Sequence, residues 1–259
     1  MTWGSTRRPS PRLPSSVPSA AAPSALAWRG AWRQLVRIRV LLFERGRYGR
    51  LALERVGGRP LLVLPQVFNP ALFASGRLLA AEVERRADLL PPGARVLDLG
   101  TGSGIGAIAA AAKAQVVVAT DVNPHAVRCA RINVLLNEVE ARVDVRCGDL
   151  FGPLGADERF DVVLFNPPYY RGTPRSPLDQ AWRSPDVIEL FARDLTRVLT
   201  PGGHALVVLS SDGEQEAFLE AFRANDLRVE VAAERDLIYE KLTLYRVRSQ
   251  STGVVGRES

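Results

Sequence analysis

From residue 95 onward, short apolar runs alternate with longer segments whose apolar or small residues suit a helix. The apolar runs predict five strands, at Arg95–Leu99, Gln115–Thr120, Arg142–Arg146, Phe160–Phe165 and His204–Ser210. The intervening segments predict four helices, at Ile105–Lys113, Pro124–Asn137, Asp186–Leu199 and Glu214–Asn225. This alternation is typical of a mostly parallel sheet that is covered by helices on both faces.

Two more strands are predicted near the C-terminus, at Leu227–Ala232 and Lys241–Val247, as an antiparallel pair at one edge. The expected fold class is therefore α/β: a Rossmann-like sheet of seven strands, mostly parallel with one antiparallel edge strand. Ligands of such open sheets bind beyond the carboxyl ends of the strands. Candidate binding residues are therefore sought where strands end.

The chain before residue 95 has a different pattern. A helix is predicted over Ala25–Phe43, two short strands at Arg50–Arg55 and Leu61–Leu64, and a helix at Leu72–Leu89. Residues 1–24 are rich in Ser, Pro and Ala without apolar periodicity, which predicts a disordered arm. The predicted organisation is an arm (1–24), a basic helix and strand segment (25–66), an α/β domain (67–248) and a flexible tail (249–259).

Charge is spread unevenly along the chain. Residues 1–60 contain twelve Arg, no Lys and two Glu, giving +10, so the rest carries −4 of the net +6. A basic segment of this kind is a solvated surface or a contact for an acidic or nucleic-acid partner. Both interpretations stay open from the sequence.

The remaining composition narrows the class of protein. No apolar run approaches the ~20 residues of a membrane span, so no membrane partner is expected. Two cysteines and two histidines are too few for a disulfide framework or a zinc cluster, and no metal site is predicted. These features fit a cytoplasmic, reducing compartment.

A glycine-rich turn follows the first strand of the alternating region, in the sequence Asp98-Leu99-Gly100-Thr101-Gly102-Ser103-Gly104. Glycine lets the backbone approach a ligand closely. A dinucleotide site is one interpretation, but a carboxylate before the turn would repel a pyrophosphate. Asp98 suits the cationic aminoacyl end of S-adenosyl-L-methionine, so Asp98, Gly100, Thr101, Gly102 and Gly104 are predicted cofactor-binding residues. The alternative is a structural turn.

Acidic residues also end the next two strands. Asp121, followed by Val122, is 23 residues after Asp98, where an acid can accept the ribose hydroxyls of a nucleoside. Its alternative role is to cap the helix that begins at Pro124. Asp149, followed by Leu150, can accept a hydrogen bond from the adenine amine, or it forms a turn.

The sequence Asn166-Pro167-Pro168-Tyr169 follows the strand Phe160–Phe165. The Asn166 side-chain carbonyl and the Pro167 backbone carbonyl can accept hydrogen bonds from a planar NH₂ group, aim its lone pair and stabilise the charge that develops on methylation. Tyr169 can stack on the planar group. These four residues are the predicted catalytic residues, and Asn166 also borders the predicted cofactor site. The alternative is an ordinary Pro-rich turn.

Together these motifs resemble those of the class I methyltransferases with an N-P-P-Y motif, and most closely the HemK family, which methylates a glutamine of peptide release factors. Ala181-Trp182 and Phe68-Asn69-Pro70 are similar to segments of its shorter branch. The resemblance covers roughly Val67–Val247. It implies an enzyme that uses S-adenosyl-L-methionine, with a protein as substrate and a peptide release factor as the family's example.

The chain departs from the family in two places. Arg183-Ser184-Pro185 stands where the family usually has Gly-Gly, and residues 1–60 match neither branch. Other N-P-P-[YF] enzymes methylate adenine N6 or guanine N2 of nucleic acids, and a small-molecule acceptor or a non-catalytic binding module are further alternatives. Arg171, Arg175 and Arg183 are predicted to meet an acidic substrate or to be solvated.

Overall fold

The computed structural model describes residues 50–175, 179–181, 183–237 and 240–250. The predicted arm (1–24), the predicted helix Ala25–Phe43 and residues 251–259 of the predicted tail lie outside this part of the chain. Among the described residues, no helix is long and apolar enough to cross a membrane.

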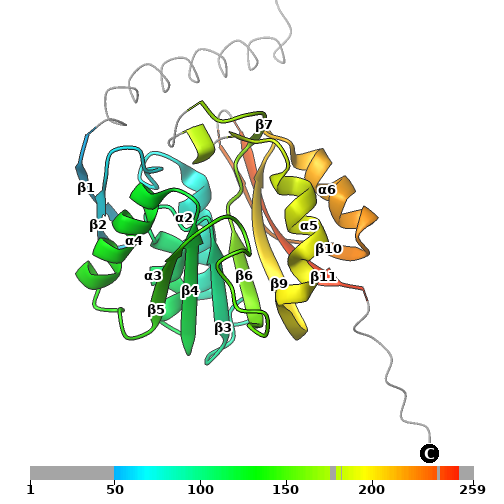
Figure 1. Ribbon diagram of the computed structural model, residues 1–259, viewed down its shortest axis with the longest axis horizontal. Helices are drawn as coiled ribbons and strands as arrows, with labels where there is room; N and C mark the ends of the chain where they lie inside the picture. The colour runs from blue at the N-terminus through cyan, green and yellow to red at the C-terminus, as the bar shows by residue number, and fades with distance from the viewer. Residues whose placement is uncertain (1–49, 176–178, 182, 238–239, 251–259) are drawn as a thin grey trace, which may run out of the picture.

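A seven-stranded sheet with the strand order β10-β11-β9-β6-β3-β4-β5 forms the centre of the molecule (Figure 1). Its strands are β3 (Arg95–Leu99), β4 (Val116–Asp121), β5 (Val143–Cys147), β6 (Phe160–Phe165), β9 (Leu199–Ser210), β10 (Leu227–Asp236) and β11 (Lys241–Ser249). Strand β11 runs antiparallel to both β9 and β10, whereas the other neighbours in the sheet are parallel. The predicted mostly parallel sheet is confirmed, with the antiparallel strand one place inside the edge that β10 forms.

Helices cover both faces of this sheet, as the alternation predicted (Figure 1). They are α2 (Ala74–Arg85), α3 (Ile105–Ala111), α4 (Pro124–Leu136), α5 (Val187–Val198) and α6 (Gln215–Ala224). Buried side chains of α2, α3 and α4 meet in one core cluster, and those of α5 and α6 meet in another. Neighbouring strand residues such as Val96 and Leu97 belong to opposite clusters because side chains alternate between the faces of a strand.

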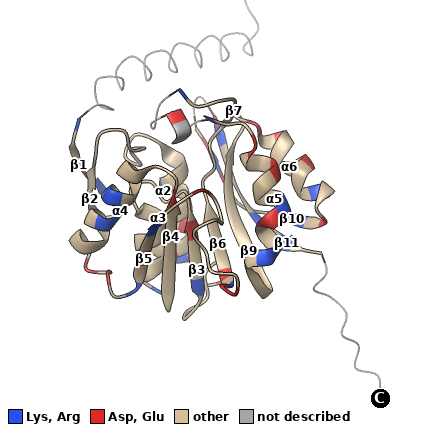
Figure 2. Cartoon of the chain, in the orientation of Figure 1, with Lys and Arg blue, Asp and Glu red and all other residues tan. Residues whose placement is uncertain are grey.

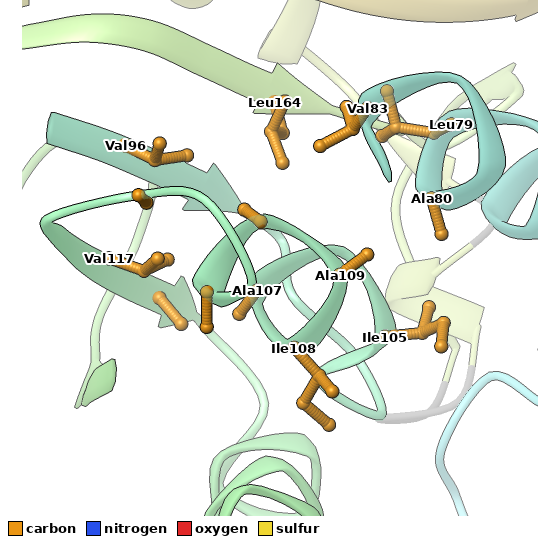
Figure 3. Close-up of a cluster of buried hydrophobic side chains, with 14 of the residues drawn as sticks. Leu79, Ala80, Val83, Val96, Ile105, Ala107, Ile108, Ala109, Val117 and Leu164 are labelled. Atoms are coloured by element: carbon orange, nitrogen blue, oxygen red, sulfur yellow. The ribbon is translucent and has the colours of Figure 1, made fainter. Parts of the chain in front are cut away.

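Small residues let α3 lie close to the sheet. Its sequence is Ile-Gly-Ala-Ile-Ala-Ala-Ala, and all seven residues are buried. In Figure 3, Ala107 and Ile108 of α3 are drawn with Val117 of β4 and Leu79 and Val83 of α2, as parts of one buried cluster. This close packing places the first turn of α3 directly beside the end of β3.

On the other face, an aromatic cluster surrounds Phe191 of α5. Its ring centroid lies 4.5 Å from that of Phe165, the last residue of β6, and 6.1 Å from that of Phe222 of α6. Phe191 is fully buried, and truncating such a side chain to Ala costs about 3–5 kcal/mol of stability. The cluster therefore fixes the end of β6, from which Asn166 follows.

A hairpin precedes the domain and packs on α4. It consists of β1 (Ala52–Val56) and β2 (Arg59–Val63). Asn133 of α4 accepts from Leu62 N at 2.7 Å and donates through Nδ2 to Leu62 O at 2.8 Å, so its amide takes the place of a neighbouring strand. The division of the chain at residues 66 and 67 stays a prediction.

Two short strands and a 3₁₀ helix follow the end of β6. Strands β7 (Tyr170–Arg171) and β8 (Arg183–Ser184) pair in parallel, and the 3₁₀ helix spans Asp179–Ala181. These short elements carry no apolar periodicity, so the sequence predicted only a loop there. They lie next to the Asn166–Tyr169 turn and form part of the site's border.

Some boundaries differ from the prediction. Helix α2 ends at Arg85, four residues before the predicted end, because Arg86 has an extended backbone. Strand β9 begins at Leu199 rather than at His204. Its pairing with β6 shifts from Leu199 opposite Phe160 to His204 opposite Val162, so the predicted turn at Pro201–Gly203 is a bulge inside the strand.

Candidate active site

A cavity of about 380 Å³ opens at the carboxyl ends of β3, β4, β5 and β6. It brings together twelve of the thirteen predicted site residues, namely Asp98, Gly100, Thr101, Gly102, Asp121, Val122, Asp149, Leu150, Asn166, Pro167, Pro168 and Tyr169. Gly104 is the exception. It begins α3 with a φ of +87°, and a Cβ there would lie 3.2 Å from Ala130 Cα, so it allows α3 and α4 to pack closely.

The glycine-rich turn owes its shape to left-handed backbone. Gly100 and Gly102 have φ values of +65° and +58°, a region that disfavours residues with a Cβ. Thr101 N, between them, donates to Thr120 O at 2.9 Å, which ties the turn to the end of β4. The turn therefore presents backbone to the cavity.

Asp98 lies under this turn. One carboxylate oxygen, Oδ2, accepts hydrogen bonds from Thr101 Oγ1 at 2.6 Å and from Ala107 N, in the first turn of α3, at 2.8 Å. Burial raises the pKa of the Asp98 carboxyl to about 6, and the two hydrogen bonds oppose that rise. A buried carboxylate that lines a cavity gains most from a cationic ligand, because little water is present to stabilise its charge.

Asp121 holds the other side of the turn. Its Oδ2 accepts from Gly102 N at 2.8 Å and its Oδ1 accepts from Asn123 N at 2.9 Å. Asn123, rather than Asp121, caps α4, because its side chain accepts from His125 N. Burial raises the pKa of the Asp121 carboxyl. Each carboxylate oxygen keeps a free lone-pair direction, so the group can accept further hydrogen bonds from a ligand.

The segment after β5 forms one rim of the cavity. Asp149 is exposed and Leu150 has a φ of +42°, which is rare for a residue with a branched side chain. A Cβ on Gly148 would lie 2.4 Å from Pro153 Cγ, so this turn is tightly packed. Asp149 and Leu150 line the cavity on its solvent side, and their contact with a cofactor stays a prediction.

The Asn166–Tyr169 turn forms the opposite wall. Asn166 lines the cavity, and its side-chain Oδ1 is buried without a hydrogen-bond partner in the part of the chain that the structure describes. A buried acceptor without a donor costs about 1–3 kcal/mol. An oxygen in this position is therefore suited to a ligand that brings an N–H or O–H donor.

Residues beyond the thirteen predicted site residues also line the cavity. Gln66 and Phe68 lie along it before α2, and Gln66 O accepts from Asn123 Nδ2 at 3.0 Å. Gly106 lies against Asp98, and Arg183 and Pro185 also line the cavity. Gly106 could have been found from the sequence, since it continues the spacing of Gly102 and Gly104, and Arg183 was predicted either to meet an acidic substrate or to be solvated. Gln66 had no sequence signal.

Basic and acidic residues lie close together around β7 (Figure 2), and two ion pairs form there. Arg171 Nη2 lies 2.6 Å from Glu189 Oε1, and Arg183 Nε lies 3.6 Å from Asp179 Oδ1. The Arg183 guanidinium also lies over the Tyr170 ring, 5.6 Å from its centroid. Residues 166–189 contain three Arg and three acidic residues, so this segment has no net charge.

Comparison with known proteins bears on what this cavity does. Residues 61–236 match the model of one protein family, described as methyltransferase small domain. The chain belongs to this family. The resemblance to class I methyltransferases is thereby confirmed, and this methyltransferase is an enzyme of that fold.

Among curated relatives, a Methanocaldococcus jannaschii protein is 31% identical over 157 residues, or 57% of this methyltransferase and 77% of the relative; its own assignment as a protein N5-glutamine methyltransferase is provisional. The release factor glutamine methyltransferase of Geobacter sulfurreducens is 34% identical, and the aligned part covers 66% of this methyltransferase and 63% of the relative. The ribosomal protein uL3 glutamine methyltransferase of Bradyrhizobium diazoefficiens is 37% identical, and the aligned part covers 49% of this methyltransferase and 44% of the relative. The methyltransferase thus spans less than two thirds of the latter two relatives.

Solved structures agree on the fold. A Thermus thermophilus 16S rRNA N2 G1207 methyltransferase in complex with AdoMet and guanosine superposes with a TM-score of 0.56 at 21% identity, covering 78% of this methyltransferase and 50% of that chain. A Methanocaldococcus jannaschii tRNA m1G37 methyltransferase has a TM-score of 0.54 at 20% identity, with 77% and 56% covered.

The two histidines and the two cysteines do not line the cavity. His125 is exposed, and His204 is buried with Nε2 2.9 Å from Leu89 O, as a structural residue would be. Cys129 is buried, with Sγ 3.1 Å from Leu62 O. By residue type both cysteines are predicted to be small buried side chains, but Cys147 is exposed, because the last residue of β5 points away from the core.

Proposed function

We propose that the methyltransferase transfers a methyl group from S-adenosyl-L-methionine to the side-chain amide nitrogen of a protein glutamine. The observation that carries the proposal is the buried, unpartnered Oδ1 of Asn166 in the wall of the cavity. An acceptor in this place suits a substrate that presents two N–H groups, as a primary amide does.

The residues present fit the cofactor. Asp98, buried beside the glycine turn, would face its cationic aminoacyl end, and Asp121 would accept its ribose hydroxyls. Val122 is 44% exposed and would offer an apolar contact to the adenine, with Asp149 and Leu150 at the rim. When bound, S-adenosyl-L-methionine supplies an electrophilic methyl group on a sulfonium.

The acceptor side follows from the chemistry of an amide. Its nitrogen lone pair is delocalised into the carbonyl, so it must be turned out of conjugation and aimed. Asn166 Oδ1 and the Pro167 carbonyl would accept the two N–H hydrogens, fix the nitrogen in line and stabilise positive charge as it develops. The proton that the nitrogen then loses goes to solvent or to a base that is outside this proposal.

The relatives support a protein substrate. The names of three of them specify glutamine in a protein, a release factor or ribosomal protein uL3. The neutral segment 166–189 also favours a protein over a nucleic acid, whose phosphates require an excess of Arg and Lys. A peptide release factor is the proposed partner.

Radiolabelled methyl transfer into a recombinant peptide release factor tests the proposal. We expect N5-methylglutamine in the hydrolysed factor, and no label after the acceptor glutamine is replaced by Ala. In a second arm, methyl transfer is run in a cell extract, which is then fractionated into protein, RNA, DNA and small molecules. Label that appears only in nucleic acid or small molecules would reject the protein substrate and favour the corresponding alternative.

A further inference from the structure

The turn that follows β9 contacts the Asn166–Tyr169 turn from behind. Glu214 N donates to Tyr169 O at 3.1 Å. A Cβ on Gly213 would lie 2.8 Å from Tyr169 O, 3.2 Å from Tyr169 Cβ and 3.4 Å from its Cα. The backbone of Tyr169 therefore lies against the bare Cα of Gly213, with no room for a side chain.

The turn that carries Gly213 is itself fixed. Ser210, which is 2% exposed, donates through Oγ to Glu240 and accepts from Asp212 N at 3.1 Å. Ser211 is tied to the first residue of β11, since its N donates to Lys241 O and its Oγ accepts from Lys241 N, both at 2.9 Å. These bonds join the Ser210–Gly213 turn to the antiparallel strand in the interior of the sheet.

We propose that Gly213 is a positioning residue for methyl transfer, because its missing side chain and the fixed Ser210–Gly213 turn set the place of Tyr169 and thereby of Asn166. The proposal rests on the proposed function in one respect, namely that Asn166 holds the acceptor amide. Gly213 touches neither the acceptor nor the cofactor cavity in this arrangement. Its effect passes through the Tyr169 backbone.

The chemical reason is geometric. An in-line attack tolerates little displacement of the acceptor, and a shift of about 1 Å can cost ~100-fold in rate. Relief of a 2.8 Å contact between a new Cβ and Tyr169 O requires a movement of several tenths of an ångström. We expect that movement to reach Asn166, three residues before Tyr169, while the glycine turn at β3 stays in place.

Labelling with ¹⁵N-asparagine tests this without any acceptor. The chain has six Asn, and the Asn166 side-chain signals are assigned by their absence in Asn166→Ala. We expect Gly213→Ala to shift the Asn166 signals and to leave those of Asn133 and Asn137 unmoved. Gly155→Ala is the matched control, because its Cβ would meet only Glu158 at 3.5 Å, and it should move none. Unmoved Asn166 signals in Gly213→Ala would overturn the proposal.

Kinetics supply the second readout. With release factor as acceptor, Gly213→Ala should lower kcat at least about tenfold while the Kd for S-adenosyl-L-methionine stays within about twofold. Equal losses in kcat and in cofactor affinity would overturn the positioning role. If release factor is no substrate of the wild type either, the proposed substrate fails, whereas the asparagine signals still decide the positioning role.

A second pair of variants covers a Gly213→Ala protein that does not fold. Ser210→Ala removes the hydroxyl that binds Glu240 and Asp212 N, whereas Ser210→Thr keeps one. We expect Ser210→Ala to shift the Asn166 signals and Ser210→Thr to restore them. If the Asn166 signals of Ser210→Ala stayed where they are in the wild type, the proposal would be overturned.

Discussion

The carboxylate of Asp98 occupies the space that a side chain at residue 106 would need. A Cβ on Gly106 would lie 2.6 Å from Asp98 Oδ1 and 2.9 Å from Oδ2. Gly106 belongs to the first turn of α3, whose Ala107 N binds the same carboxylate. Gly106 thus makes room for the carboxylate of Asp98, eight residues before it.

Replacing Gly106 tests this relationship. We expect Gly106→Ala to push Asp98 out of place and to weaken S-adenosyl-L-methionine binding at least about tenfold, since overpacking of this kind costs about 1–3 kcal/mol. Calorimetric titration measures the Kd, with Gly155→Ala as the control. A folded Gly106→Ala protein with the wild-type Kd would contradict the assigned role of Asp98.

Asn166→Ala separates the acceptor side from the cofactor side. We expect kcat to fall about 10²–10³-fold, because the variant loses a group that stabilises developing charge, while cofactor affinity stays unchanged. Asn225→Ala, at the end of α6, is the matched control because its Nδ2 donates to Ala221 O in its own helix. Normal turnover of Asn166→Ala would show that its carbonyl takes no part in transfer.

Arg183 connects Tyr170 and Asp179 at the border of the cavity, next to the Asn166–Tyr169 turn. It stacks on Tyr170 and pairs with Asp179, contacts worth together about 1–1.5 kcal/mol near the surface. We expect Arg183→Ala to raise the KM for the protein acceptor about tenfold and to leave the cofactor Kd unchanged. Steady-state kinetics with release factor measure both, and Arg193→Ala, on the exposed side of α5, is the control. An unchanged KM would remove Arg183 from acceptor binding.

His204 predicts a pH dependence of stability. Burial lowers its pKa from 6.5 to about 4 in the folded protein, so the folded state binds fewer protons than the unfolded state between these values. The contribution of neutral His204 is fully present above pH 6.5 and is lost as the pH falls toward 4. This loss amounts to roughly 3 kcal/mol, at ~1.4 kcal/mol per unit of pKa.

We therefore expect His204→Gln to gain stability relative to wild type as the pH falls from 7 to 4. Glutamine keeps an N–H donor for Leu89 O but does not titrate. Asp98, whose raised pKa acts with the opposite sign, is present in both proteins and cancels in the difference. Urea unfolding at each pH gives the two free energies of unfolding, and a difference that is independent of pH would contradict the buried neutral state of His204.

The pattern of apolar and polar residues predicted much of the fold, because the strands and helices depend on nearby residues in the sequence. The strands Arg95–Leu99 and Phe160–Phe165 have their predicted bounds, since both are buried on two faces and bounded by turn residues. The positions after strands β3, β4, β5 and β6 were identified as one site because the carboxyl ends of parallel strands meet at one edge.

Other features depended on contacts between distant residues. Three features of this kind are the inner place of β11, the packing of the hairpin on Asn133 and the pairing of β7 with β8. In each case the sequence of one segment does not indicate which other segment it contacts. The exposure of Cys147 depended likewise on which side of an edge strand faces solvent.

By itself, the sequence determined the order of strands and helices, the glycine turn and the acids at the strand ends, because each follows from periodicity and from the chemistry of single residues. Only the tertiary structure decided that Gly106 makes room for Asp98, that Asn166 Oδ1 has no partner among the described residues and that Gly213 lies against Tyr169. Gly106 is 8 positions from Asp98, and Gly213 is 44 positions from Tyr169. Such contacts, and the burial of Asn166 Oδ1, arise only when the folded chain packs distant segments together.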